Sequence, residues 1–384
     1  MPSVSPSALS VPHSRIRELA DIATGMDGVI KLYFGESNLP TPEYLKQAAR
    51  AAMDAGYTYY TENAGLASLR EALASYYAKL HGVDLDPSTE IVVTASGVQA
   101  LNLGLRCLVD PGDDGIVLTP AWPNESSILS MHQARARQVP HPVRNGRCEI
   151  DFDALEQAAT PRTRLILYTS PSNPLGWVAT EDDQERLLEF ARRKGLWLVA
   201  DEVYERIYYL GRTVPSILRK CTREDAVLVI QSFSKSYCMT GWRLGWLIGR
   251  KDLVARAAQL NEFVVSCAPA FVQKAAETAL SCGEKELEEM VARLKHNRDF
   301  CLSALAGMPG VTLPRPDGAF YLFPRIEAAA DSFGFCKELL LETKVGLAPG
   351  IAFGEGGEGS VRICYASEQA LLEEAIARLK SFLS

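Results

Sequence analysis

The sequence of 384 residues has few of the features that mark membrane, secreted, metal-binding or nucleic-acid-binding proteins. No apolar run approaches the roughly 18 residues that a membrane span requires. Its nine cysteines include no C-x-x-C pair and its five histidines have no metal-ligand spacing, so neither a disulfide framework nor a metal site is expected. The net charge is −7, and no basic block or appended basic domain indicates nucleic-acid binding.

The N-terminal residues also show no targeting signal. Residues 1–11 are rich in Ser and Pro, without the basic and then apolar stretch of a signal peptide. We therefore expect a flexible arm here and a cytoplasmic protein with reduced thiols. A composition of 47% hydrophobic and 23% charged residues is that of a soluble globular protein, and the length favours two domains.

Short apolar runs alternate with helical patterns in the middle of the chain. Continuous apolar runs of this kind predict a mostly parallel sheet with helices on both faces. The predicted strands are 90–94, 115–119, 164–169, 196–200 and 226–231, and the predicted helices are 43–55, 65–80, 97–109, 125–133 and 180–194. Thr41 is the expected cap of the first helix and Gly56 its left-handed end, and Thr180 with Asp183 is expected to cap the last.

The pattern changes after about residue 260. Long helical patterns at 269–281 and 284–305 precede short strands at 318–323 and 360–364 and a closing helix at 368–383. We therefore predict an α/β protein in three parts. An N-terminal segment, 1–40, joins a small α+β domain at 266–384, and a large domain spans 41–265.

Residues that could bind a ligand follow the first three predicted strands, because ligands of parallel-sheet proteins lie at such strand ends. Ser96 and Gly97 open a helix whose N–H groups favour a phosphate, although Ser96 could be a simple cap. Trp122 could stack on a flat ring or pack in the core. Asn173 could donate a hydrogen bond to a ligand oxygen or serve only its Pro- and Gly-containing turn.

The fourth and fifth strand ends carry the charged residues. Asp201 follows an apolar run and would be half-buried, a position that requires a cationic partner such as a protonated pyridine nitrogen. Lys235 lies between serines and is followed by Arg243, so it could be a desolvated Schiff-base nucleophile. Taken alone, it could equally be an exposed lysine in a serine-rich turn. The joint occurrence of these groups at consecutive strand ends favours one cofactor site.

Five motifs in the same order resemble those of class I/II aminotransferases, enzymes of fold type I that depend on pyridoxal 5′-phosphate (PLP). The resemblance covers about residues 14–384 and is most specific in S-F-S-K-x-x-x-x-x-G-x-R-x-G at 232–245. The supporting motifs are Y-x-x-x-x-G-x-x-x-L-R at 60–70, P-x-W at 120–122, S-N-P at 172–174 and D-E-x-Y at 201–204.

The resemblance implies a role for each motif residue. Lys235 would bind PLP as a Schiff base and then move the substrate Cα proton, and Asp201 would pair with the ring nitrogen. Tyr204 and Asn173 would bind the ring oxygen, and Trp122 would stack on the ring. The phosphate would be held by Ser96, Gly97, the Val98 backbone, Ser232, Ser234 and Arg243, and Tyr60 would reach the phosphate in the neighbouring subunit of a homodimer whose active sites lie at the interface.

The substrate-binding residues implied by the resemblance are Arg362, Gly35, Trp122 and Asn173. Arg362 would grip the α-carboxylate as a bidentate fork, whereas its plain alternative is a surface arginine on a short strand. A second arginine could bind a side-chain carboxylate of the substrate. The candidates for this role are Arg315, Arg325 and residues of a partner chain, and the sequence does not choose among them. Tyr33 and Phe34 favour, weakly, a neutral or aromatic side chain.

The expected activity is a ping-pong transfer of an amino group between an L-amino acid and a 2-oxo acid through pyridoxamine phosphate. A PLP-dependent lyase of the same fold, such as a β-C–S lyase or a cyclopropane-forming synthase, would share Lys235 and Asp201. A non-catalytic PLP-binding regulator is the alternative of another class. The amino donor, the 2-oxo acid and the pathway are left open by the sequence.

Overall fold

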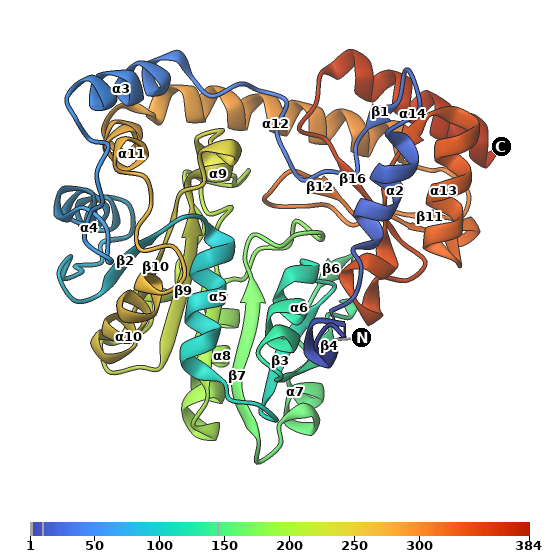
Figure 1. Cartoon of the computed structure of the whole chain (residues 1–384). Coiled ribbons are helices and arrows are strands. Elements are labelled where there is room, and N and C mark those ends of the chain that lie inside the picture. Colours follow the sequence, from blue (N-terminus) through green and yellow to red (C-terminus); the bar gives the residue numbers. More distant parts are fainter. Residues whose placement is uncertain (1–2, 10, 145) are drawn as a thin grey trace.

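A seven-stranded sheet forms the centre of the computed structural model, which describes residues 3–9, 11–144 and 146–384 (Figure 1). The order of its strands is β2-β10-β9-β8-β7-β3-β4. In that order their bounds are Ile91–Thr94, Gly245–Gly249, Val227–Ser232, Trp197–Asp201, Thr163–Thr169, Asp114–Thr119 and Arg135–Pro140. Every pairing is parallel except the two made by β10, so the predicted mostly parallel sheet is confirmed.

The five predicted strands are β2, β3, β7, β8 and β9, and two more were not predicted. β4 is an edge strand in which only Val139 is buried, so it has no apolar run to reveal it. β10 is apolar, but it directly follows the irregular segment after Lys235 and returns antiparallel between β2 and β9.

Helices cover both faces of the sheet, as expected for continuous apolar strands. Neighbouring residues of β3 show the alternation, because Ile116 packs in one hydrophobic core and Val117 in the other. The core of Val117 also contains residues of α5 (Gly97–Leu108), α6 (Pro123–Met131) and α10 (Lys251–Glu262). The core of Ile116 contains residues of α8 (Glu181–Lys194), whose predicted Thr180–Asp183 capping box is confirmed.

Helix α3 (Glu43–Asp54) has the predicted position, and Gly56 has the predicted left-handed conformation with φ 85°. The predicted cap by Thr41 is wrong, because no side chain in the described ranges caps α3. The Thr41 hydroxyl instead donates to the Cys238 carbonyl at 2.5 Å and accepts from Trp242 Nε1 at 2.9 Å. Tertiary contacts with the segment that follows Lys235 thus replace the local cap.

The C-terminal third contains α11 (Ala270–Cys282), α12 (Glu284–Leu305), α13 (Ser332–Thr343) and α14 (Gln369–Leu383). α11 packs against α3 and against α4 (Ala67–His81), whereas α12 runs across the top of the molecule to α14 (Figure 1). A small sheet joins β12 (Tyr321–Leu322), β16 (Val361–Cys364) and β15 (Ala348–Pro349). The domain limits at residues 40 and 265 stay a prediction.

The N-terminal segment lies against these C-terminal elements. β1 (Ile30–Lys31) pairs in parallel with β14 (Val345–Gly346), and α2 (Arg15–Ala23) packs on α13 and β15. Residues 1, 2 and 10 of the predicted flexible arm lie outside the described residues, and α1 covers Pro6–Leu9. No helix within the described ranges is long and apolar enough to cross a membrane.

Candidate active site

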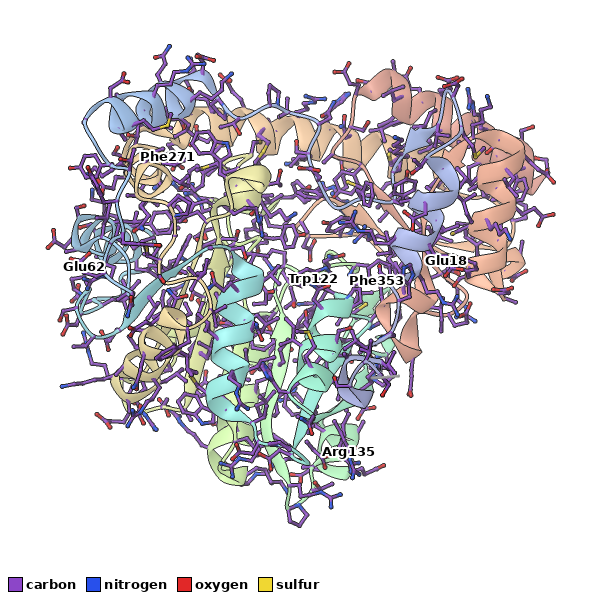
Figure 2. The ribbon with its side chains drawn as sticks, in the orientation of Figure 1. Glu18, Glu62, Trp122, Arg135, Phe271 and Phe353 are labelled. Carbon is purple, nitrogen blue, oxygen red and sulfur yellow. The ribbon has the colours of Figure 1, made fainter. Side chains whose placement is uncertain are left out.

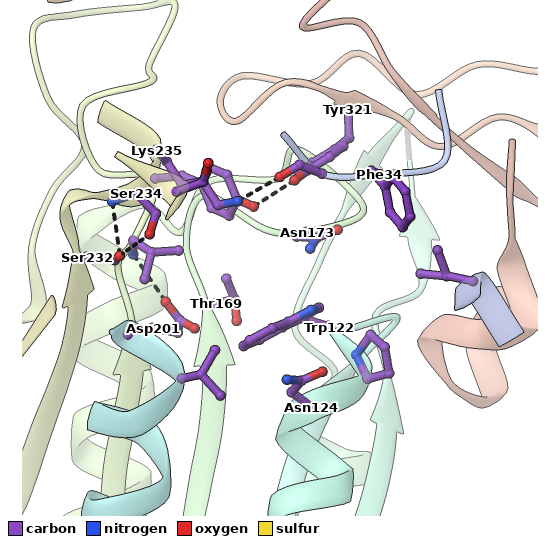
Figure 3. A pocket seen from close by; sticks show the side chains of 18 of the residues that line it. Phe34, Trp122, Asn124, Thr169, Asn173, Asp201, Ser232, Ser234, Lys235 and Tyr321 are labelled. Carbon is purple, nitrogen blue, oxygen red and sulfur yellow. Dashed lines mark hydrogen bonds between the residues drawn. The ribbon is translucent and has the colours of Figure 1, made fainter. Parts of the chain in front are cut away.

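A cavity of about 400 Å³ lies at the carboxyl ends of the central strands (Figure 3). Trp122 stands at the place where the sheet faces the C-terminal part, close to Phe353 (Figure 2). The Ala121 N–H donates to the Phe353 carbonyl at 2.9 Å across this boundary. The cavity therefore lies between two parts of the fold, a usual position for ligand sites.

Most of the predicted site residues line this one cavity. They are Gly35, Gly97, Val98, Trp122, Asn173, Asp201, Tyr204, Ser232, Ser234, Lys235, Arg243 and Arg362. Ser96 lines a neighbouring cavity that also includes Val98 and Arg243. Tyr60 is 86% exposed and does not line the cavity of its own chain.

Lys235 projects into the cavity from the short helix α9 (Phe233–Ser236), which directly follows β9. Its amine donates a hydrogen bond to the Gly35 carbonyl at 2.6 Å. Only glycine fits at position 35, because an added Cβ would overlap the Tyr321 hydroxyl. Burial lowers the pKa of Lys235 to about 8, so roughly a tenth of the amine is neutral and nucleophilic at pH 7, far more than for an ordinary lysine.

Asp201 ends β8 and is only 3% exposed. The Val203 N–H donates to one of its oxygens at 3.1 Å, and no other hydrogen bond to the carboxylate occurs in the described part of the chain. Burial raises the pKa of Asp201 to about 7, while that N–H and Lys235 act in the opposite direction. A buried carboxylate with so few partners is suited to a cationic ligand group.

A second buried carboxyl, which the sequence did not reveal, lies close to Asp201. Glu125 accepts a hydrogen bond from the Thr169 hydroxyl at 2.6 Å, and Thr169 pairs in register with Asp201 on the adjacent strand. The other Glu125 oxygen has no partner among the described residues. Burial, with the charge of Asp201, holds the pKa of Glu125 well above its usual range, so Glu125 is the neutral member of the pair. In the sequence it resembles an ordinary acid in a first helical turn.

Backbone and hydroxyl groups converge where α5 begins. The Ser232 hydroxyl accepts from the Ser234 N–H at 3.1 Å and lies 2.9 Å from the Ser234 hydroxyl. An added Cβ at Gly245 would lie 2.5 Å from the Gly97 nitrogen, so only glycine allows β10 to pass this close to the helix. The N-terminus of a twelve-residue helix beside two serines is able to bind an anion.

Two residues beside this helix end have strained backbones. Ser96 has φ 146° and Arg243 has φ 56°, values that L-residues other than glycine rarely adopt. The Ser96 hydroxyl accepts from the Gln99 N–H at 3.1 Å, so it does form the cap that the sequence offered as the alternative. Arg243 donates to the Thr240 carbonyl at 2.7 Å, and its exposed guanidinium lines the cavity.

Arg362 comes from β16 and is 2% exposed, which excludes the alternative of a surface arginine. Its Nη1 donates to Asn173 Oδ1 at 2.7 Å and its Nη2 to the Tyr33 carbonyl at 2.5 Å, whereas Nε has no partner in the described chain. The guanidinium lies 4.5 Å from the centroid of the Tyr321 ring. A buried guanidinium without a carboxylate partner calls for an anionic ligand.

Asn173 and Tyr204 direct polar groups into the same space. Because Asn173 Oδ1 accepts from Arg362, the amide Nδ2 is left as a donor. The Tyr204 hydroxyl lies 2.7 Å from the Tyr321 hydroxyl, and burial raises the pKa of Tyr204. Both tyrosines are therefore neutral. One hydroxyl of the pair donates to the other, and the second O–H can donate to a ligand oxygen.

The two arginines considered for a second carboxylate lie elsewhere. Arg325 donates to the Glu358 carbonyl at 3.3 Å, Arg315 lies 3.9 Å from Asp299, and neither lines the cavity. The cavity does contain Arg17, from α2, which sequence reasoning missed. Its position depends on how the N-terminal segment folds back onto β14 and α13, which no local pattern reveals.

The fold and the cavity together define a class of protein. The cavity contains a lysine of lowered pKa and a buried carboxylate with few partners, and it lies at the strand ends of an α/β fold. This combination indicates an enzyme that binds an anionic ligand there. Arg362, unpaired by any carboxylate in the described chain, adds a place for a second anion.

Comparison with known proteins narrows this class to a family. The family model "Aminotransferase class I and II" matches residues 28–379. Aromatic-amino-acid aminotransferase 2 of Thermococcus litoralis and the aspartate aminotransferase of Pyrococcus abyssi are each 35% identical, covering 96% of this chain and 95% of theirs. The crystal structure of an aromatic aminotransferase from Pyrococcus horikoshii OT3 is 33% identical with a TM-score of 0.89, covering 96% of this chain and 98% of that one.

The chain therefore belongs to the aminotransferase class I and II family, and it is an enzyme that transfers amino groups. This confirms the predicted family, fold class and activity. Neither the lyase nor the regulator has a counterpart among the relatives named above. The names of those relatives differ in the amino acid, so the side-chain preference has to come from this chain's own residues.

Proposed function

We propose that this aminotransferase binds PLP in the cavity and moves the amino group of an L-amino acid to a 2-oxo acid in two half-reactions. The single observation that carries the proposal is the convergence of the Lys235 amine, the Asp201 carboxylate and the N-terminus of α5 on one cavity. When bound, PLP supplies a carbonyl that takes up the amino group and a ring that accepts the electron pair left when Cα loses its proton.

The residues around the start of α5 fit the phosphate of PLP. Backbone N–H groups of Gly97 and Val98 would donate to it, together with the hydroxyls of Ser232 and Ser234. The Arg243 guanidinium would add a full charge. The Ser96 hydroxyl would help by fixing the start of the helix through its cap, in which it accepts from the Gln99 N–H.

A further set of residues in the cavity fits the ring. Asp201 would pair with the protonated ring nitrogen, and that cation would lower the pKa of the carboxyl from its value of about 7. Asn173 Nδ2 and the Tyr204 hydroxyl would donate to the ring oxygen. Trp122 would stack on the face of the ring.

Lys235 would serve twice. Its neutral amine would attach to the cofactor carbonyl and would be displaced by the amino group of the substrate. The freed amine would then take the proton from the substrate Cα and deliver it to the former carbonyl carbon of the cofactor. The Gly35 carbonyl, 2.6 Å from the amine, would hold it close between these two tasks.

Arg362 would bind the α-carboxylate that all amino donors and 2-oxo acids share. Its unpartnered Nε is available for a new hydrogen bond, and its bonds to Asn173 and the Tyr33 carbonyl fix the plane of the guanidinium. Trp122, Asn173 and the Gly35 backbone would form the walls around the reacting carbon. Because one site binds both substrates in turn, the kinetics would be ping-pong.

A second copy of the chain is part of the proposal. Exposed apolar residues gather on two adjacent segments, Tyr57–Tyr60 and Phe263–Val265, and the Asn261 side chain donates to the Asn63 carbonyl at 2.8 Å between them. Exposed aromatic residues of this kind are typical of protein interfaces. In a homodimer, Tyr60 would reach the phosphate in the partner's cavity.

The test is a pair of half-reactions followed by absorbance. The PLP-loaded protein is mixed with one amino acid at a time, and the cofactor band is expected to be replaced by that of the aminated cofactor. Addition of a 2-oxo acid should restore the first band. If no amino acid in a broad panel changes the band, or if ammonia is released without recovery, amino transfer at this site is wrong.

A further inference from the structure

One charged side chain in the cavity has no role in the proposed reaction. The charged residues that line the cavity are Arg17, Asp201, Lys235, Arg243 and Arg362. The ring nitrogen, the carbonyl, the phosphate and the α-carboxylate account for all of them except Arg17. Arg17 is an exposed residue at the rim of this cavity, where its guanidinium is able to bind a further anionic group on the ligand.

Arg17 has no acidic partner among the residues that the structure describes. The acid beside it in sequence, Glu18, accepts from Arg15 at 2.9 Å. No carboxylate of residues 3–9, 11–144 or 146–384 lies within ion-pair distance of Arg17, whose guanidinium carbon instead lies 5.4 Å from the centroid of the Phe34 ring. The aromatic ring supports the charge without neutralising it.

The position of Arg17 on α2 is also unfavourable for the helix itself. Ser14 caps α2 by accepting from the Arg17 N–H, and Arg17 lies in the first turn, where the helix dipole disfavours cations. Ser14 and Ile16 line the cavity as well, so the start of this nine-residue helix faces the ligand space. An anion there would be attracted by both the helix end and the guanidinium.

Arg17 and Arg362 contact neighbouring residues of one segment. Arg362 donates to the Tyr33 carbonyl, and Arg17 lies over the ring of Phe34. Both arginines line the same cavity, and Phe34 lines it as well. A ligand whose α-carboxylate is held by Arg362 would therefore extend its side chain past Phe34 toward Arg17.

We propose that Arg17 binds the side-chain carboxylate of a dicarboxylic amino acid or 2-oxo acid, which makes such compounds preferred substrates. This inference rests on the proposed function, because it takes Arg362 as the site of the α-carboxylate. Arg17 is then a specificity residue of the same cavity, supplied by the chain's own N-terminal segment.

The experiment compares Arg17→Gln and Arg17→Lys with the wild-type holoenzyme. The donors are L-glutamate and L-aspartate against L-phenylalanine and L-leucine, and the quantity measured is the ratio of kcat/KM values. For Arg17→Gln, selectivity for L-glutamate over L-phenylalanine is expected to fall on the order of 100-fold, with partial retention in Arg17→Lys. Arg15→Gln is the matched control, because Arg15 is two residues away, pairs with Glu18 and does not line the cavity.

A binding measurement separates this inference from the proposed function. Calorimetric titration of the holoenzyme with glutarate and with pentanoate is expected to show tighter binding of glutarate, and Arg17→Gln should abolish that difference. Equal binding of the two acids by the wild type, or equal losses for acidic and neutral donors in Arg17→Gln, would overturn the role of Arg17 while leaving amino transfer intact. If no donor reacts at all, the proposed function fails, and the glutarate comparison still decides what Arg17 binds.

Discussion

Arg362 and Asn173 are joined by a hydrogen bond of 2.7 Å that crosses from the small C-terminal sheet to the loop after β7. This bond fixes the orientation of two groups at once. It sets the plane of the guanidinium that would hold the substrate, and it leaves the amide Nδ2 as the donor that would bind the cofactor ring oxygen. Under the proposed function, this one contact would link substrate binding to cofactor binding.

Arg362→Lys should weaken every amino donor to a similar extent, because all donors share the α-carboxylate. The lysine would lose the bidentate fork and the bond to Asn173, so kcat/KM is expected to fall on the order of 100-fold to 1,000-fold. The measurement is kcat/KM for acidic, aromatic and aliphatic donors. Arg325→Lys, on an exposed side chain outside the cavity, is the control and should leave kcat/KM unchanged. A loss confined to one class of donor would contradict this role.

The two neighbouring buried carboxyls, Asp201 and Glu125, should respond differently to neutralisation. Asp201→Asn removes the charge that would stabilise the ring cation, so kcat is expected to fall at least on the order of 100-fold. Glu125→Gln replaces a carboxyl that is already neutral, and we expect kcat to change less than about tenfold. Steady-state kinetics and the pH dependence of the cofactor absorbance of both variants provide the test. Comparable losses of kcat in the two variants would mean that Glu125 is ionised and would contradict its assignment as the neutral carboxyl.

Glu202 should make the folded protein less stable as the pH rises. It accepts from the Ser216 hydroxyl at 2.7 Å and from the Ile217 N–H at 2.9 Å, but burial and the charge of Glu205 raise the pKa of Glu202 to about 7. The pKa of Glu202 in the folded protein lies above the unfolded value of about 4.5. The neutral Glu202 carboxyl therefore contributes its full stabilisation of the folded state below pH 4.5, and this contribution is lost as the pH rises through about 7. The loss amounts to about 3 kcal/mol.

Glu202→Gln should reduce the dependence of the free energy of unfolding on pH, whatever its effect on absolute stability. The free energy of unfolding of the cofactor-free protein is measured by denaturant titration between pH 4.5 and 8. Exposed Glu189→Gln serves as the control and should keep the slope of the wild type. An unaltered slope in Glu202→Gln would show that Glu202 is ionised throughout this range.

If the proposed dimer forms, Tyr60→Phe should accelerate the release of PLP from it, because no hydroxyl would then reach the phosphate in the partner's cavity. The loss of one hydrogen bond to a charged group corresponds to roughly a tenfold to hundredfold change. Tyr59→Phe is a close control, since Tyr59 is 83% exposed beside Tyr60, which is 86% exposed. Dialysis followed by fluorescence of the released cofactor measures the effect. Identical release by both variants, or a monomer in light scattering, would contradict the proposed interface.

The sequence was sufficient wherever one residue type in one local pattern determines the structure. Apolar runs predict five strands, and the residues that follow each strand point to the cavity, because parallel strands place their carboxyl ends at one edge. Thr41 was misassigned because Cys238 and Trp242, about 200 residues away, compete for its hydroxyl. Such competition is invisible in a local pattern.

Arg17 and Glu125 were missed for a related reason. Both look like ordinary polar residues in the first turn of a helix. Only tertiary packing places Arg17 at the cavity and Glu125 against Thr169, beside Asp201. β10 was overlooked because its place between β2 and β9 depends on the irregular turn before it. The cavity could therefore be predicted from the strand ends, whereas the residues that adjust its charge and selectivity could not.

The central claim is that the Lys235 amine is the group that binds the cofactor carbonyl. Reduction of the PLP-loaded protein with borohydride, followed by proteolysis and mass spectrometry, tests this claim most directly. We expect the pyridoxyl group on the peptide that carries Lys235, and no labelled peptide from Lys235→Ala treated in the same way. A label on another lysine, or a cofactor band and label that persist in Lys235→Ala, would contradict the account.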